Sequence, residues 1–105
     1  MSSDENKKRY NTILIESIHE AIYFGEVVLY FLELDSDLNR NEIVDKPELF
    51  EMELKKTVGP WMARIMEKNI LQVLCNKIGI KYSEIDGLTF SEAIKEAFKR
   101  YNTRR

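Results

Sequence analysis

The chain has 105 residues, of which 44% are hydrophobic and 32% charged, and its formal net charge is -2. This length and balance are typical of one globular domain with a single core. The small net charge excludes a general attraction to nucleic acid or to an anionic membrane. The single cysteine excludes an internal disulfide framework. Because the first residues lack the charged-then-apolar pattern of a signal peptide, we expect a cytoplasmic protein.

The N-terminal third of the chain is dominated by one long apolar stretch. Residues 1–10 show no apolar period, so we expect a flexible polar lead-in there. From about Asn11 to Leu34, apolar residues recur at spacings of three and four, which predicts one long helix. Its second half is apolar on most sides and should be covered by other helices or by a second chain. Five ionisable side chains argue against a membrane span. The main stripe of this helix consists of Leu14, Ile18, Ala21, Gly25, Val28 and Leu32. A second stripe on another side consists of Tyr23, Val27, Tyr30 and Leu34.

Gly25 stands in the middle of that stripe, where glycine costs about 1 kcal/mol relative to alanine. We expect another helix to approach closely at this position, with a kink as the alternative. The following run, Asp35–Asn41, is dense in turn-forming residues and should end the helix. It lacks the glycine and the bidentate acid that a calcium-binding loop needs.

Two further helices are predicted between residues 45 and 79. Asp45 as N-cap and Pro47 in the first turn mark the start of one helix. Gly59 and Pro60 end or sharply bend it. The next helix begins near Pro60 and ends at Gly79, a natural C-cap. Its expected inner stripe consists of Met62, Ile65, Met66, Ile70, Val73 and Leu74, with Asn69 on the same side.

The last helix begins at Thr89-Phe-Ser-Glu92, which is a capping box. Its apolar face consists of Phe90, Ala93, Ile94, Ala97, Phe98 and Tyr101. Residues 102–105 follow as a basic tail. No stretch alternates between apolar and polar residues in the manner of a strand. The sequence therefore predicts an all-α fold, a compact four-helix domain over residues 11–101 that is built around the long N-terminal helix.

Residues that could carry chemistry are few. Metal sites need several donors, and the chain has one histidine, His19, and one cysteine, Cys75. Glu16-Ser-Ile-His19 matches one half of a di-metal bundle motif, but no second histidine completes it. No glycine-rich phosphate loop or dinucleotide fingerprint is present. We therefore expect no catalytic residues, no metal, no cofactor and no enzymatic activity.

Two groups of residues could instead contact a macromolecule. The candidate protein interface consists of Tyr23, Phe24, Tyr30, Phe31 and Trp61, aromatic residues of the kind that dominate binding hot spots. For Trp61 we favour a place in the core, with the interface as the alternative. The candidate nucleic-acid contacts are Lys95, Lys99, Arg100, Arg104 and Arg105, although basic residues at a helix C-terminus also complement the helix dipole. We expect a homodimer or an accessory subunit that works through protein contacts, with a nucleic-acid-associated factor as the alternative.

Hydrophobic and turn positions follow a particular order across residues 13–98. They are Ile18-His-Glu-Ala21, Gly25, Leu32-Glu33, Ile43, Pro47-Glu-Leu-Phe50, Gly59, Ile70, Leu74, Ile78-Gly79-Ile80 and Phe90. This order resembles the small archaeal domains called Nitrosopumilus output domains. The resemblance implies an all-helical, archaeal, non-enzymatic output or interaction module, and it carries over no catalytic residues. No sensor domain accompanies the motif in this sequence, so an accessory subunit is an equally good expectation.

Overall fold

The computed structural model describes residues 2–103, and all of its regular structure is helical. The elements are α1 (Ser2–Ala21), α2 (Gly25–Ser36), the 3₁₀ helix η1 (Arg40–Asp45), α3 (Pro47–Ile78), the 3₁₀ helix η2 (Tyr82–Glu84) and α4 (Phe90–Thr103). The described residues contain no strand, which confirms the all-α class. Within this range, no helix is both long enough and apolar enough to cross a membrane.

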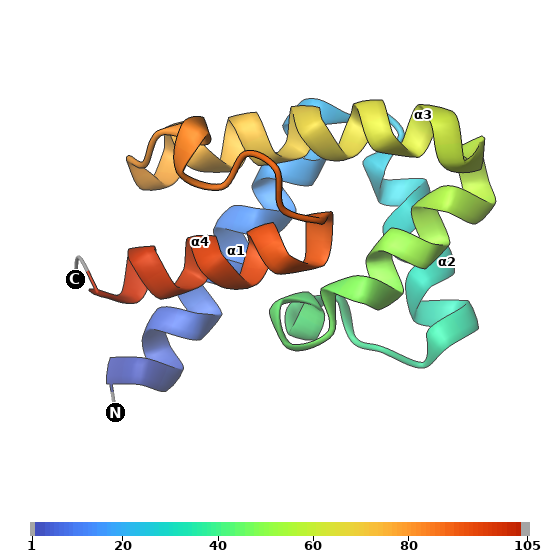
Figure 1. Cartoon of the computed structure of the whole chain (residues 1–105). Coiled ribbons are helices and arrows are strands. Elements are labelled where there is room, and N and C mark those ends of the chain that lie inside the picture. The colour runs from blue at the N-terminus through green and yellow to red at the C-terminus, as the bar shows by residue number, and fades with distance from the viewer. Residues whose placement is uncertain (1, 104–105) are drawn as a thin grey trace.

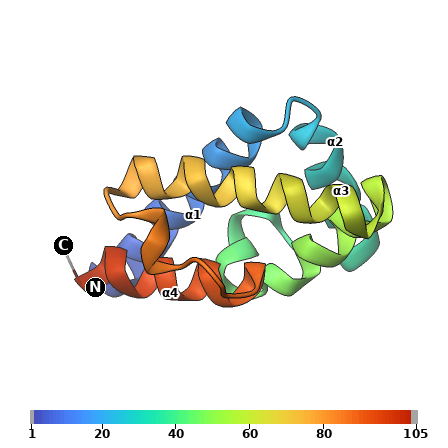
Figure 2. The same cartoon turned by 45° about the horizontal axis from the view of Figure 1, so that its top comes forward.

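The helix that touches every other element is α3, not the N-terminal helix. Figure 1 shows α3 along one edge of the molecule, with α1 crossing behind it and α4 below it. The two ends of the chain lie at one end of the molecule, and α2 lies at the other (Figures 1 and 2). Fully buried side chains of α1, α3 and α4 form the centre of the core, including Leu14, Ile18, Ile70, Leu74 and Ile94.

The expected flexible lead-in is instead the first part of α1, which begins at Ser2. Tyr10 is fully buried, and its hydroxyl donates a 2.6 Å hydrogen bond to the carbonyl of Ile94. Lys7 forms a 2.7 Å ion pair with Asp45. Asp45 was the expected N-cap of α3, but Lys46 occupies that place without a side-chain cap. The prediction of a flexible lead-in was wrong because Asp45 and Ile94, the partners of Lys7 and Tyr10, lie 38 and 84 residues away in the sequence.

The predicted helix from Asn11 to Leu34 is two helices, separated by a turn at residues 22–24. Gly25 is the first residue of α2, and its backbone packs directly on α1. A Cβ atom on Gly25 would lie 3.1 Å from both the side chain and the carbonyl oxygen of Ile18. The alternative, a bend of the chain, is therefore present, and the close approach at Gly25 comes from the preceding part of the same predicted helix and not from another helix.

The predicted bend of α3, its C-cap and the capping box of α4 are confirmed. Gly59 has φ 88° and ψ 158°, which only glycine adopts readily, and it bends α3 just before Pro60. Gly79 ends α3 in the left-handed conformation and donates its amide to the carbonyl of Cys75. Thr89 and Glu92 exchange side-chain-to-backbone hydrogen bonds of 3.1 Å, as a capping box requires.

The inner stripe predicted for the second part of α3 is partly wrong. Met62 and Ile65 are exposed, and so is Asn69. The side that faces the core instead includes Ala63 and Glu67, followed by Ile70, Leu71 and Leu74. Ala63 is small and Glu67 is charged, so neither indicated a buried position in the sequence. The large apolar side chains therefore placed the predicted stripe on the wrong side of the first two turns after Pro60.

Candidate protein interface

Helix α2 has one buried apolar face and one exposed apolar face. Val28, Leu29 and Leu32 are fully buried against the rest of the chain. On the opposite side, the spacing i, i+3, i+4, i+7 aligns Val27, Tyr30, Phe31 and Leu34 along the helix. Between 40% and 63% of each of these four residues is exposed. The second stripe of the N-terminal sequence therefore remains outside the core, and none of the described residues covers it.

Aromatic residues extend this face past the start of α2. Tyr23, in the turn between α1 and α2, is 99% exposed. Its ring meets Phe24 edge-to-face at a centroid distance of 5.8 Å, and the rings of Tyr30 and Phe31 meet similarly at 5.3 Å. Phe24 is only half-buried and packs against the core. Of the residues predicted on this helix, Tyr23, Tyr30 and Phe31 are exposed, whereas Phe24 also supports the fold.

A second exposed apolar set follows the bend of α3. Trp61 is 79% exposed, so the favoured prediction that it lies in the core was wrong, and Met62 and Ile65 are exposed as well. Helix α2 runs beside the part of α3 before this bend, where Lys56 pairs with Asp35 at 3.2 Å (Figures 1 and 2). We call the two sets together the apolar surface: Tyr23, Val27, Tyr30, Phe31, Leu34, Trp61, Met62 and Ile65.

The area of the two exposed sets follows from the exposed fractions of their residues. At about 200 Å² for each aromatic side chain, its four aromatic residues expose roughly 500 Å². The four aliphatic residues bring the total to roughly 700 Å², at about 100 Å² for each full side chain. Tyr23 and the exposed face of α2 account for roughly 500 Å² of this total, which is within the range of the largest apolar patch on a typical monomer, about 300–600 Å². Each partner in a standard protein interface buries about 800 Å².

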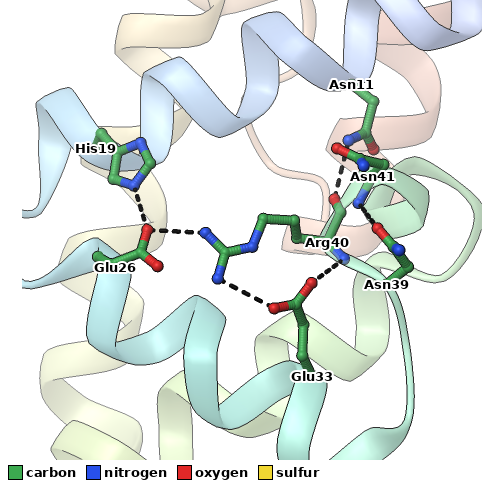
Figure 3. Close-up of polar contacts among 7 residues, drawn as sticks. All are labelled: Asn11, His19, Glu26, Glu33, Asn39, Arg40 and Asn41. Atoms are coloured by element: carbon green, nitrogen blue, oxygen red, sulfur yellow. Dashed lines mark hydrogen bonds and ion pairs between the residues drawn. The ribbon is translucent and has the colours of Figure 1, made fainter.

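A polar network fixes α2 in the orientation that exposes this face (Figure 3). The guanidinium of Arg40 lies between two carboxylates of α2 and donates to Glu26 at 2.8 Å and to Glu33 at 3.1 Å. The backbone amide of Arg40 also donates to Glu33, at 2.9 Å. These bonds with Arg40 hold the pKa values of Glu26 and Glu33 below their usual range, and the contact with His19 adds to the effect at Glu26.

The same network ties η1 to α1. Asn11 is buried, and its amide nitrogen donates to the carbonyl of Arg40 at 3.0 Å, while its amide oxygen accepts from the amide of Val44 at 2.9 Å. His19 contacts Glu26 at 3.2 Å. Because α1, η1 and α2 are all joined through Arg40, the apolar face of α2 cannot turn toward the core without breaking several charged hydrogen bonds.

The candidate nucleic-acid contacts on α4 are largely engaged within the chain. Arg100 pairs with Glu84 at 2.7 Å and with Glu96 at 2.9 Å. Lys95 lies 3.5 Å from Glu48. Lys99 is exposed and forms no ion pair with the described residues. Arg104 and Arg105 lie outside the described residues.

The residues considered for chemistry do not come together. Cys75 is buried, and burial raises the pKa of its thiol to about 11, which disfavours the nucleophilic thiolate. His19 is exposed and contacts only Glu26 among the residues drawn in Figure 3. Within residues 2–103, no group of three or more His, Cys, Asp or Glu residues could hold a metal ion.

Sequence reasoning missed part of the apolar surface. Val27 and Leu34 were recognised as a second stripe but not as interface residues, and their position on the α2 face opposite Leu32 is the signal that could have added them. Met62 and Ile65 were assigned to the core.

Comparison with protein-family models, with curated proteins and with solved structures finds no match for this chain. The resemblance to the Nitrosopumilus output domains therefore stays an expectation from the sequence.

Proposed function

We propose that this protein is a non-enzymatic interaction module whose apolar surface binds another protein chain, and that this chain is a second copy of itself. The observation that carries the proposal is the outward face of α2, where Val27, Tyr30, Phe31 and Leu34 lie exposed although the helix is firmly held. Tyr, Phe, Trp and Met are the residues that protein interfaces favour over the rest of a surface.

The area of the apolar surface supports a dimer. Roughly 700 Å² on each copy would bury close to the 1,600 Å² of a standard interface once the polar rim is added. Two-fold symmetry places the same patch on both sides, so α2 of one copy would pack against α2 of the other, with Tyr30 and Phe31 near the centre. The pairing of large aromatic side chains at the centre matches the usual position of hot spots.

The charges at the edge of α2 support a second copy rather than a strongly charged partner. Arg40 neutralises much of the charge of Glu26 and Glu33 on one edge, and Lys56 pairs with Asp35 on the other. A rim of a single sign would repel its own copy, whereas this rim contains both signs. The rim therefore carries little net charge, which favours the approach of a second copy over that of a strongly charged partner.

The test is the molar mass of the purified protein by light scattering over a range of concentrations. We expect a dimer, and we expect Phe31→Asp and Tyr30→Glu to give folded monomers, because a charge would be buried without a partner. Circular dichroism confirms that each variant keeps its helices. A protein that stays a monomer at every concentration contradicts the proposal of self-association.

Met52→Glu is the matched control. Met52 is 59% exposed on α3 but belongs to the part before the bend and not to the apolar surface. This variant introduces the same kind of charge at a similar exposure and should remain a dimer. If Met52→Glu disrupts the dimer while Phe31→Asp does not, the interface lies elsewhere on the molecule.

A further inference from the structure

Glu67 is a buried carboxylate without a partner. It lies on the core side of α3, and only 9% of the residue is exposed. Its Oε2 atom is buried and accepts no hydrogen bond, and the side chain forms no ion pair with the described residues. Buried carboxylates are normally paired or hydrogen-bonded, because leaving one without a partner costs several kcal/mol. The position therefore lacks a group that could donate to Glu67.

Two neighbouring cavities share Glu67 in their walls. The larger one has a volume of about 320 Å³ and the smaller one about 210 Å³. Both are also lined by Arg64, Leu88 and Phe90. The larger volume lies at the lower end of the range that small-molecule sites occupy. Leu88 and Phe90 form an apolar wall, so the cavity combines a buried acceptor with a hydrophobic surface.

The charges around the larger cavity indicate the kind of ligand. Glu51 is engaged, since it accepts from the hydroxyl of Ser91 at 2.9 Å and lies 3.9 Å from Lys55. Arg64 is exposed and forms no ion pair with any described residue. The positive charges of Lys55 and Arg64 act to lower the pKa of Glu67, but burial outweighs them, and neither residue forms an ion pair with Glu67. The cavity therefore offers one carboxylate and one guanidinium that are not joined in an ion pair. A purely cationic ligand would be repelled by Arg64, and a purely anionic ligand would be repelled by Glu67.

We propose that this cavity binds a small zwitterion with an apolar body, of the chemical class of the aliphatic α-amino acids. The ammonium group donates to the carboxylate of Glu67, and the carboxylate of the ligand accepts from Arg64. The aliphatic part lies against Leu88 and Phe90. This site lies on α3 and the segment before α4, and it does not depend on the self-association proposed above.

The experiment is an NMR titration of the isotope-labelled protein with millimolar L-leucine near pH 8. Two further probes each keep half of the recognition chemistry, namely 3-methylbutylamine, which lacks the carboxylate of leucine, and 4-methylpentanoate, which lacks its ammonium group. We expect L-leucine to shift the amide signals of Leu88 and Phe90 in a saturable way. We expect each half-probe to bind at least about tenfold more weakly, because it loses one charged contact.

Variants locate the two contacts. Glu67→Gln keeps the size of the side chain but removes the charge, and Arg64→Gln does the same at the other end, so each should weaken L-leucine binding by about tenfold or more. Lys68→Gln is the control, because Lys68 lines only the smaller cavity and should leave the affinity unchanged. The unligated spectrum shows whether each variant is folded.

Three results overturn the proposal. The first is the absence of saturable shifts at Leu88 and Phe90 with any of the three probes. The second is an affinity for L-leucine that Glu67→Gln leaves unchanged. The third is binding of the amine alone as tightly as L-leucine, which would remove Arg64 from the site.

Discussion

Glu67→Gln should remove a large part of the dependence of stability on pH between about pH 4.5 and pH 7. Burial raises the pKa of the Glu67 carboxyl from 4.5 to about 7, and the negative charge of Glu51 adds to the effect. The difference of about 2.5 pH units corresponds to about 3 kcal/mol, at 1.36 kcal/mol per unit. The whole free energy of unfolding of a domain of this size is about 5–15 kcal/mol.

The sign of the effect follows from where the proton is held. As the pH rises above 4.5, the unfolded chain releases the Glu67 proton, whereas the folded chain holds it until about pH 7. The unfolded state therefore binds fewer protons in this window, and the free energy of unfolding contributed by Glu67 falls as the pH rises. Above pH 7 the penalty is complete. Glutamine does not titrate, so the variant gains stability relative to the parent chain over the same window.

The assay is urea unfolding, followed by circular dichroism, of the parent chain and the variant at a series of pH values. The difference between the two chains is the relevant quantity, because Glu26, Glu33 and Glu48 have lowered pKa values and stabilise the fold in the opposite direction. Glu42→Gln, at an exposed position, serves as the control. A difference between parent and Glu67→Gln that is constant from pH 4.5 to pH 8 would refute the reasoning.

Three further substitutions test the packing. Gly25→Ala should destabilise the fold by about 1–2 kcal/mol in urea unfolding, because its Cβ would press on the carbonyl of Ile18; an unchanged midpoint would mean that α2 shifts freely. Gly59→Ala should lower the free energy of unfolding by about 1–3 kcal/mol through backbone strain alone, because φ is 88° and no atom lies near enough to clash with the added methyl group. The slope of the unfolding free energy against urea concentration should not change, and a gain in stability would contradict the bend. Tyr10→Phe should cost about 1 kcal/mol in thermal unfolding by losing the hydrogen bond to Ile94, and an unchanged melting temperature would show that the bond adds nothing.

Local signals were sufficient for much of the fold. Pro47, Gly59, Gly79 and the capping box at Thr89 each act through their own backbone geometry, so their effect could be predicted without knowing any partner. The buried stripe of Leu14, Ile18, Val28 and Leu32 could be predicted because all four contribute large apolar side chains at helical spacing. Such features depend on neighbours within a few positions along the chain.

The features that were missed depend on distant partners or on polar residues. The first turns of α1 look like a charged tail until Lys7 meets Asp45 and Tyr10 meets Ile94. Glu67 faces the core, although a glutamate in a sequence indicates a solvent-exposed position. The exposure of Trp61 follows from the direction of α3 after Gly59, and a bend predicted from sequence does not give a direction. For the candidate interface, composition could name the aromatic residues but not the side of the helix on which they lie.

The contact between α1 and α4 determines when the fold can be completed during synthesis. Tyr10 reaches its partner only when Ile94 is present, 84 residues later, and Asn6 bonds to Asn102 across 96 residues. At about 5–20 residues per second, a ribosome would need at least about 4 s to supply the missing helix. Until then the buried face of α1 has no cover from α4, so the nascent chain should expose it to chaperones and to other nascent chains. Folding would then end in one late step, in which the last helix closes on the first.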